Sequence, residues 1–280
     1  MNSIELYNSN ALACSKNTTR RYSTSFSLGI KLLGNQVRQA VYAIYGFVRF
    51  ADEIVDTFHD HDKASLLQRF REETFRSIDE GISFNPILHS FQRTVNQYNI
   101  DKELIDAFFD SMAMDLNHKQ YDFKNYQNYI YGSAEVVGLM CLRVFYRDDR
   151  EGYEALKHPA RKLGEAFQKV NFLRDVQADL KERGRTYFPH VDLSNFTFVQ
   201  KQQIEKEIEE DFREAYKGIL QLKKEARLGV YIAYIYYQKL FCKIKRNSPE
   251  DILQKRIRVS NWSKMRLLFQ GVVRHEIGLV

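Results

Sequence analysis

The chain has 280 residues, 44% of them hydrophobic, and a formal net charge of +6 at pH 7. A chain of this length can enclose a cavity in its core without disulfide bonds. Cys14, Cys141 and Cys242 are too widely spaced for a disulfide framework or a zinc site, so we expect reduced thiols in a cytoplasmic protein. The start of the chain does not resemble a secretory signal, and no uncharged run approaches the ~20 residues that cross a bilayer.

The apolar residues recur with a period of 3.6 between the four prolines, which predicts a mainly helical protein. No obvious linker divides the sequence, so we expect one domain over residues 1–280. The expected helices span residues 36–58, 63–80, 86–98, 101–118, 122–146, 153–182, 198–226, 228–246 and 260–272. Breaks are expected at Pro86 and Pro159, and a loop at 183–190. The charged segment 201–217 is predicted to be an amphipathic helix with a solvated face.

The predicted helix 36–58 carries apolar residues around most of its circumference, which is typical of a helix surrounded by protein. One polar stripe interrupts this surface, formed by Tyr45, Arg49, Asp52 and Asp56 at spacings of three or four residues. The two carboxylates would lie about 6 Å apart along the helix and repel each other. Burying them is costly unless a cation lies between them, so the stripe indicates a cation site.

A second polar stripe lies in the predicted helix 153–182, formed by Gln168, Asn171, Asp175 and Asp179. Oxygen ligands suit Mg²⁺, with Mn²⁺ as a possible substitute, and magnesium prefers phosphate oxygens as its remaining ligands. Arg49 and Arg174 stand beside the acidic pairs and could clamp a phosphate group. One such stripe is usually a solvated surface, but two on apolar helices, each beside an arginine, favour a magnesium site.

The C-terminal region is strongly basic. From Lys239 to Arg274 the sequence has ten lysines or arginines against Glu250 and Asp251, with Trp262 and other apolar residues among them. Such a region could bind nucleic acid, an anionic membrane surface or a phosphorylated small molecule, or it could be an ordinary solvated surface. No nucleic-acid-binding motif is present, so we expect no nucleic-acid partner.

The residues of both stripes resemble a known family. "YGFVRFADEIVD" (45–56) is similar to the first aspartate-rich motif of the squalene/phytoene synthases, and "FQKVNFLRDVQADLKERGRTYFP" (167–189) is similar to the second motif with its arginine-rich loop. Further segments agree in the same order, namely "STSFS" (23–27), "MAMDL" (112–116), "YIYGSAEVVG" (129–138), "YYQKLFCKI" (236–244) and "QKRIRVS" (254–260). The resemblance implies an all-α, single-domain isoprenoid-synthase helical bundle around a central cavity, and a magnesium-dependent head-to-head prenyl transferase.

The resemblance also implies roles for individual residues. The metal ligands would be Asp52, Asp56, Asn171, Asp175 and Asp179. The catalytic residues would be Asp52, Asp56, Asp175, Asp179, Tyr45 and Arg49. The substrate-binding residues would be Ser25, Phe26, Gln168, Arg174, Arg183, Arg185, Tyr187, Tyr237 and Arg256. Three positions depart from the family pattern: Glu53 replaces an aspartate, Glu135 stands where glycine is frequent, and Thr24 stands where some relatives carry a basic residue that contacts diphosphate.

Such a site would ionise an allylic diphosphate in a cavity that excludes water. The resemblance of "GRTYFP" and "MAMDL" to bacterial phytoene synthases favours condensation of two geranylgeranyl diphosphates to phytoene, without NADPH. Squalene or dehydrosqualene synthesis from two farnesyl diphosphates is the alternative, and a non-catalytic helical assembly factor, which would be expected to lose its acidic pairs, is a distant one. Because substrates and product are lipids, we expect peripheral contact with the inner face of the membrane. The sequence leaves the oligomeric state open.

Overall fold

The computed structural model describes residues 2–117, 121–180, 185–189, 191 and 196–280, and within these ranges it contains helices and loops but no β-strand. The all-α prediction is therefore confirmed. The α-helices are α1 (Ser3–Tyr22), α2 (Thr24–Lys31), α3 (Asn35–Asp56), α4 (Lys63–Glu80), α5 (Pro86–Tyr98), α6 (Lys102–Asn117), α7 (Phe123–Ile130), α8 (Val136–Phe145), α9 (Arg150–Ala178), α10 (Phe198–Ile219), α11 (Lys224–Lys245), α12 (Pro249–Gln254) and α13 (Asn261–Glu276), with a π-helical turn at Tyr131–Glu135 between α7 and α8.

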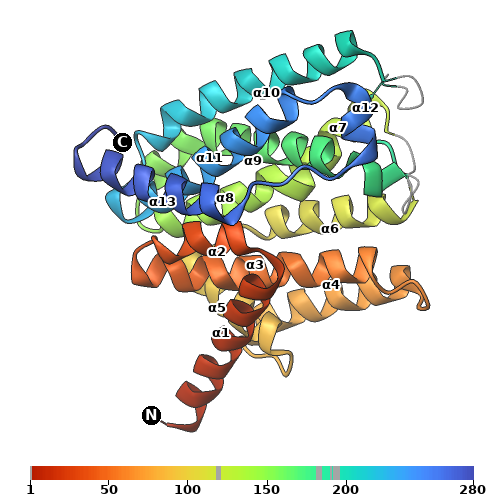
Figure 1. Cartoon of the computed structure of the whole chain (residues 1–280). Helices are drawn as coiled ribbons and strands as arrows, with labels where there is room; N and C mark the ends of the chain where they lie inside the picture. The colour runs from red at the N-terminus through yellow and green to blue at the C-terminus, as the bar shows by residue number, and fades with distance from the viewer. Residues whose placement is uncertain (1, 118–120, 181–184, 190, 192–195) are drawn as a thin grey trace.

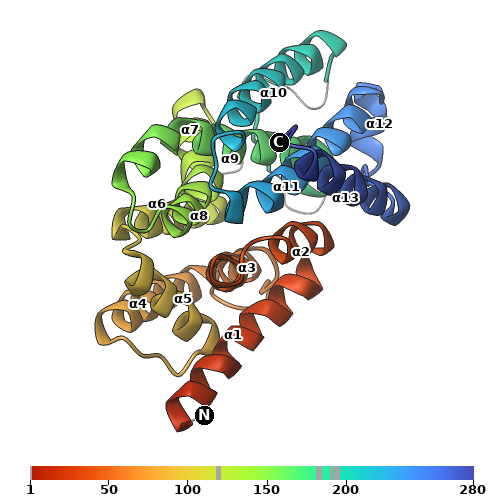
Figure 2. The ribbon, with the colours of Figure 1, turned by 90° about the vertical axis from the view of Figure 1, so that its left-hand side faces the viewer.

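The N-terminal and C-terminal helices form two stacked parts. Helices α1–α5 make up the lower part and α6–α13 the upper part in Figures 1 and 2, and α1 projects from the lower part. Across the junction, α3 packs against α6 and α8, and α2 packs against α11. Both chain ends lie on the left side in Figure 1. None of the helices in the described ranges is long and apolar enough to span a membrane.

Every helix that the periodicity predicts is present, with shifts at the ends. The predicted helix 122–146 includes the π-turn, where Gly132 is required because a Cβ atom there would lie 2.3 Å from the Ala107 carbonyl oxygen of α6. The largest boundary error lies between α10 and α11, because α10 ends at Ile219 and a turn precedes Lys224. The prediction of a single domain over residues 1–280 stays a prediction.

The sequence pattern does not predict α1, because its buried face consists of small residues. Ala11, Ser15 and Thr19 are buried at four-residue intervals. The Ser15 hydroxyl lies 2.6 Å from that of Ser90 in α5, and a Cβ atom on Gly46 of α3 would lie only 2.8 Å from it. Helix α1 therefore packs through small side chains that let the backbones approach closely. It lacks the apolar stripe by which periodicity reveals a helix. The helices α2 and α12, of 8 and 6 residues, are too short for a periodic signal.

The break expected at Pro159 is wrong, because α9 continues through this residue. An internal proline removes one backbone hydrogen bond and disfavours the helix. The Pro159 ring packs closely on α10, where a Cβ atom on Gly218 would lie 2.4 Å from Pro159 Cβ. This packing offsets part of the cost, and α9 remains one uninterrupted helix of 29 residues.

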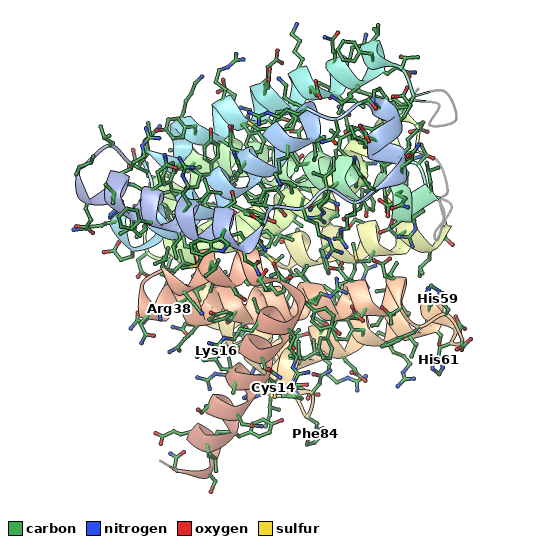
Figure 3. All side chains as sticks on the ribbon, viewed as in Figure 1. Cys14, Lys16, Arg38, His59, His61 and Phe84 are labelled. Atoms are coloured by element: carbon green, nitrogen blue, oxygen red, sulfur yellow. The ribbon has the colours of Figure 1, made fainter. Side chains whose placement is uncertain are left out.

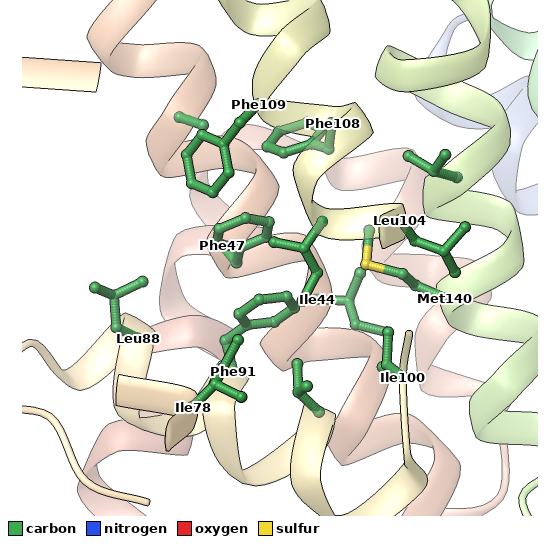
Figure 4. Packing of buried hydrophobic residues seen from close by; sticks show 14 of the residues in the cluster. Ile44, Phe47, Ile78, Leu88, Phe91, Ile100, Leu104, Phe108, Phe109 and Met140 are labelled. Carbon is green, nitrogen blue, oxygen red and sulfur yellow. The ribbon is translucent and has the colours of Figure 1, made fainter. Parts of the chain in front are cut away.

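The apolar side of α3 is fixed by a cluster of aromatic residues (Figure 4). The Phe47 ring is fully buried and stacks on Phe91 of α5, with 3.9 Å between ring centroids and an angle of 4° between the planes. Phe108 and Phe109 of α6 contact the same ring, at centroid distances of 5.2 Å and 5.5 Å. Because α5 and α6 hold this face of α3, the polar stripe of α3 is directed elsewhere, into the cavity described below.

The prediction for segment 201–217 is wrong for part of its charged residues. Lys201, Glu205 and Asp211 of α10 are buried, and Asp211 is only 3% exposed. Its carboxylate accepts hydrogen bonds of 2.8 Å from both Lys162 and Lys169 of α9. The charge pattern alone does not distinguish this buried ion-pair network, which joins α9 to α10, from a solvated face.

We expect the substitution Asp211→Ala to lower the free energy of unfolding by about 3–5 kcal/mol, because it removes the most buried of the carboxylates that face the Lys169 ammonium and leaves Glu165 as its close partner. Urea unfolding monitored by circular dichroism would measure the change. Glu207→Ala is the matched control, since the Glu207 side chain is 58% exposed and lies 3.3 Å from the same ammonium. Equal losses for both variants would contradict the role of Asp211.

Candidate functional site

A cavity of about 550 Å³ lies between the two parts of the molecule and is lined mainly by α2, α3, the π-turn with α8, α9 and α11. Its lining changes from apolar to polar along two helices. On α3, Val41 and Ile44 precede the acidic residues, and on α9, Leu156 and Leu163 precede the polar stripe. Arg185, which follows α9, contacts Asp56 at the end of α3, so the polar ends of both helices meet.

The structure brings the residues predicted from sequence into this one cavity. Its lining includes Ser25, Phe26, Tyr45, Arg49, Asp52, Asp56, Gln168, Asn171, Arg174, Asp175, Asp179, Arg185, Tyr187, Tyr237 and Arg256. Arg183 lies outside the described residues. The two polar stripes therefore share one end of an otherwise apolar cavity, although their chemical roles stay predictions.

On the α3 side, Arg49 stands between carboxylates and an aromatic ring. Its Nη1 atom lies 3.7 Å from Asp52 Oδ2, it pairs with Glu53, and its guanidinium lies 4.4 Å from the centre of the Tyr22 ring. Its buried Nε atom has no hydrogen-bond partner in the described part of the chain, which leaves one donor available to a ligand. Burial raises the pKa of Tyr45 to about 12, so this hydroxyl keeps its proton at neutral pH.

On the α9 side, Asp175 is held by two arginines. Arg174 donates to both carboxylate oxygens, at 3.0 Å and 2.5 Å, and Arg256 Nε lies 2.8 Å from Oδ1. Burial lowers the pKa of Arg174, but the hydrogen bonds to Asp175, together with the nearby Tyr237 and the Asp175 charge, raise the pKa overall. Tyr237 donates a hydrogen bond of 3.1 Å to Asn171 Oδ1 and thereby fixes the orientation of this amide.

Asp115 of α6 is a residue of the site that the sequence did not single out. It lines the cavity and its side chain is 7% exposed. Tyr121, Tyr129 and Tyr187 donate hydrogen bonds to it at 3.1, 2.7 and 3.1 Å. Burial raises its pKa, while Arg185 and the tyrosine hydroxyls act in the opposite direction. The available signal was the carboxylate of "MAMDL", but nothing in its spacing indicated these partners.

Arg185 joins Asp115 to the α3 stripe. Its Nη1 atom lies 3.2 Å from Asp56 Oδ1 and 3.6 Å from Asp115 Oδ1. Burial lowers the pKa of Arg185, but the neighbouring Asp115, Tyr187 and Asp56 raise it above the usual arginine value. One permanent cation therefore ties α6 and the segment after α9 to the end of α3.

The donor set of the cavity fits a magnesium ion that is shared with a phosphate ligand. The polar end of the cavity offers carboxylate and amide oxygens from Asp52 and Asp56 on α3 and from Asn171, Asp175 and Asp179 on and just after α9. Among the residues that the structure describes, no group of three or more His, Cys, Asp or Glu side chains could hold a metal alone. Magnesium commonly takes one or two carboxylates and completes its shell with water and substrate phosphate.

The three departures from the family pattern lie outside the cavity lining. Glu53 pairs with Arg49 and so positions it. Glu135 accepts a hydrogen bond of 2.5 Å from Arg161 and does not reshape the cavity with its own side chain. Thr24 accepts a hydrogen bond of 2.9 Å from Lys264 of α13.

We expect Asp115→Ala to destabilise the protein by about 3 kcal/mol, because three buried tyrosine hydroxyls and Arg185 lose an acceptor at once. Thermal or urea unfolding would measure the loss. Asp110→Ala on the same helix is the control, since its side chain is 67% exposed and its ion pair with Arg71 lies at the surface. An unchanged stability of the Asp115 variant would show that the cluster does not hold the site together.

Comparisons with known proteins indicate the family of this chain. Residues 19–263 match the model of the squalene/phytoene synthase family. The phytoene synthase of Arthrospira platensis is 30% identical over 276 residues, covering 89% of this chain and 88% of its own. The 15-cis-phytoene synthase of Synechococcus elongatus is 28% identical over 280 residues, covering 91% and 90%. A crystal structure of a dehydrosqualene synthase with a ligand superposes with a TM-score of 0.81 at 22% identity, covering 96% and 98%. The chain belongs to the squalene/phytoene synthase family.

Proposed function

We propose that this prenyl transferase condenses two molecules of geranylgeranyl diphosphate head to head to phytoene and releases diphosphate. One observation carries the proposal: acidic stripes from α3 and α9, with arginines beside them, meet at the polar end of an apolar cavity. The chain that offers this arrangement is 30% identical to a phytoene synthase over nearly its full length. The polar end would hold the diphosphates and the apolar part their hydrocarbon tails.

The arginines of the site already face carboxylates, and this pairing suits an incoming diphosphate. Arg49, Arg174, Arg185 and Arg256 can turn from their carboxylates to diphosphate oxygens, which guanidinium groups bind in a bidentate manner. Magnesium, when held by the carboxylates and Asn171, would neutralise the charge that develops on the leaving diphosphate. Magnesium dependence is part of the proposal, with manganese as a possible substitute.

The remaining lining protects the reaction. Phe167 stacks on Tyr237 at a centroid distance of 3.9 Å and, with Phe26 5.8 Å from the Tyr237 ring, forms an aromatic wall beside the polar end. Apolar and aromatic walls exclude water, which would otherwise capture an allylic carbocation, and ring faces stabilise cations. Tyr45 and Tyr237 remain protonated, because burial raises the pKa of both, and therefore act as hydrogen-bond donors.

The second candidate is the synthesis of squalene or dehydrosqualene from two farnesyl diphosphates. The fold of this chain is similar to that of a dehydrosqualene synthase, which favours this candidate at the level of fold only. The non-catalytic reading has less support, because both acidic stripes and their arginines are intact. We further propose a cytoplasmic enzyme that contacts the inner face of the membrane peripherally and needs no NADPH.

Incubation of the purified protein and Mg²⁺ with farnesyl or geranylgeranyl diphosphate, each with and without NADPH, tests the proposal by mass spectrometry of the hydrocarbon product. We expect a C40 product from geranylgeranyl diphosphate whose yield does not depend on NADPH. A C30 hydrocarbon as the preferred product would instead identify the second candidate. Absence of any product from folded protein would support the non-catalytic reading.

We expect Asp52→Asn and Asp175→Asn to reduce turnover at least about 100-fold, because each removes a carboxylate that would hold magnesium against diphosphate. Steady-state rates and a circular dichroism spectrum would be measured together, so that misfolding is recognised. Asp60→Asn is the control, since Asp60 is exposed in the loop that follows α3. A near-normal rate of either site variant would refute its assignment as a metal ligand.

A further inference from the structure

Helix α13 carries an apolar stripe on its exposed face. Trp262 is 88% exposed, Met265 54%, Phe269 72% and Val273 40%, and Ile277, directly after the helix, is 63% exposed. Their spacing of three or four residues places them on one side of the helix. On the opposite side, Gly271 is buried, and a Cβ atom there would lie 2.2 Å from Ile232 of α11. The helix is thus tightly packed on its inner face and apolar on its outer face.

The exposed face of this segment is net positive. Arg258, Arg266 and Arg274 are exposed on or just before α13, and Glu276 at the end of the helix is the acidic residue among them. Arg266, one turn after Trp262, is exposed beside the stripe. Two copies of this face in contact would bring like charges together, whereas an anionic lipid surface would complement them.

We propose that the outer face of α13 docks the protein on a bilayer that contains anionic lipid. The stripe of Trp262, Met265, Phe269, Val273 and Ile277 enters the boundary between headgroups and acyl chains, and the flanking arginines contact lipid phosphates. Amphipathic helices with aromatic and apolar residues on one face and basic residues beside it bind bilayers in this way. This assignment rests on the peripheral membrane contact proposed above and gives it a defined surface.

The docking face lies next to the walls of the cavity. Lys264 of α13 donates a hydrogen bond to Thr24 of α2, and its ammonium lies 5.6 Å from the centre of the Tyr236 ring of α11. Ser25 and Tyr236, on those two helices, line the cavity. A bilayer under α13 would therefore lie one helix away from the place where prenyl tails are proposed to bind.

The composition of the chain provides a direct probe of this surface, because Trp262 is its single tryptophan. We would mix the full-length protein with vesicles of phosphatidylcholine, with or without phosphatidylglycerol, and record both sedimentation and tryptophan emission. We expect binding only to the anionic vesicles, a shift of the emission to shorter wavelength, and quenching by lipids brominated on their acyl chains. Binding should weaken as salt is added.

Paired variants separate this face from other exposed residues. Phe269→Ser should weaken binding to anionic vesicles about fivefold or more, while Phe84→Ser should not, although Phe84 is 99% exposed in the loop between α4 and α5 (Figure 3). Arg266→Glu should have a similar effect, with Lys16→Glu on α1 as its control. All four variants retain Trp262 as the reporter.

Three results would overturn the proposal. Sedimentation with vesicles but without a change in Trp262 emission would place the membrane contact on another surface. No sedimentation with either vesicle type would refute membrane docking altogether. An emission shift that depends on protein concentration and needs no vesicles would identify a second copy of the chain as the occupant. Because the measurement needs no turnover, its failure is distinct from a failure of phytoene synthesis.

Discussion

The site depends on positive charges that stand beside the carboxylates inside a largely apolar cavity. Asp52, Asp56, Asp115 and Asp175 line this cavity, and each has an arginine nearby. Arg185 contacts both Asp56 and Asp115 and so connects α3, α6 and the segment after α9. Without such counter-charges, the acidic ends of α3 and α9 would repel each other across the cavity.

Packing on the far sides of α3 and α9 orients these helices so that their ion pairs face the cavity. The Phe47–Phe91 stack holds one side of α3, and this leaves the polar stripe of α3 facing the cavity. The buried pairs of Asp211 with Lys162 and Lys169 hold α9 against α10 on the outer side of the molecule. Each stripe is therefore oriented from behind by contacts that take no part in binding a ligand.

The sequence could predict what depends on helical spacing and could not predict what depends on contacts between distant segments. The polar stripes that contain Asp52 and Asp175 could be predicted, because residues spaced three or four apart lie on the same face of a helix. The role of Asp115 could not be predicted, because its partners at 121, 129, 185 and 187 come together only in the folded chain. Helix α1 was not predicted for another reason. Its buried face consists of small residues such as Ser15, which give no apolar periodicity. Pro159 misled the prediction because its packing on Gly218 is invisible in sequence.

Because α9 continues through Pro159, a single helix lines the cavity from its apolar part to its polar end. Leu156 lines the cavity near one end of this helix and Asp175 near the other, and a rise of 1.5 Å per residue separates them by about 28 Å. Since Leu156 and Asp175 stand on one continuous helix, the helical rise fixes their separation along the cavity. The length of hydrocarbon that fits is therefore set by the bulk of side chains along the helix, and each full turn marks a step of about 5.4 Å.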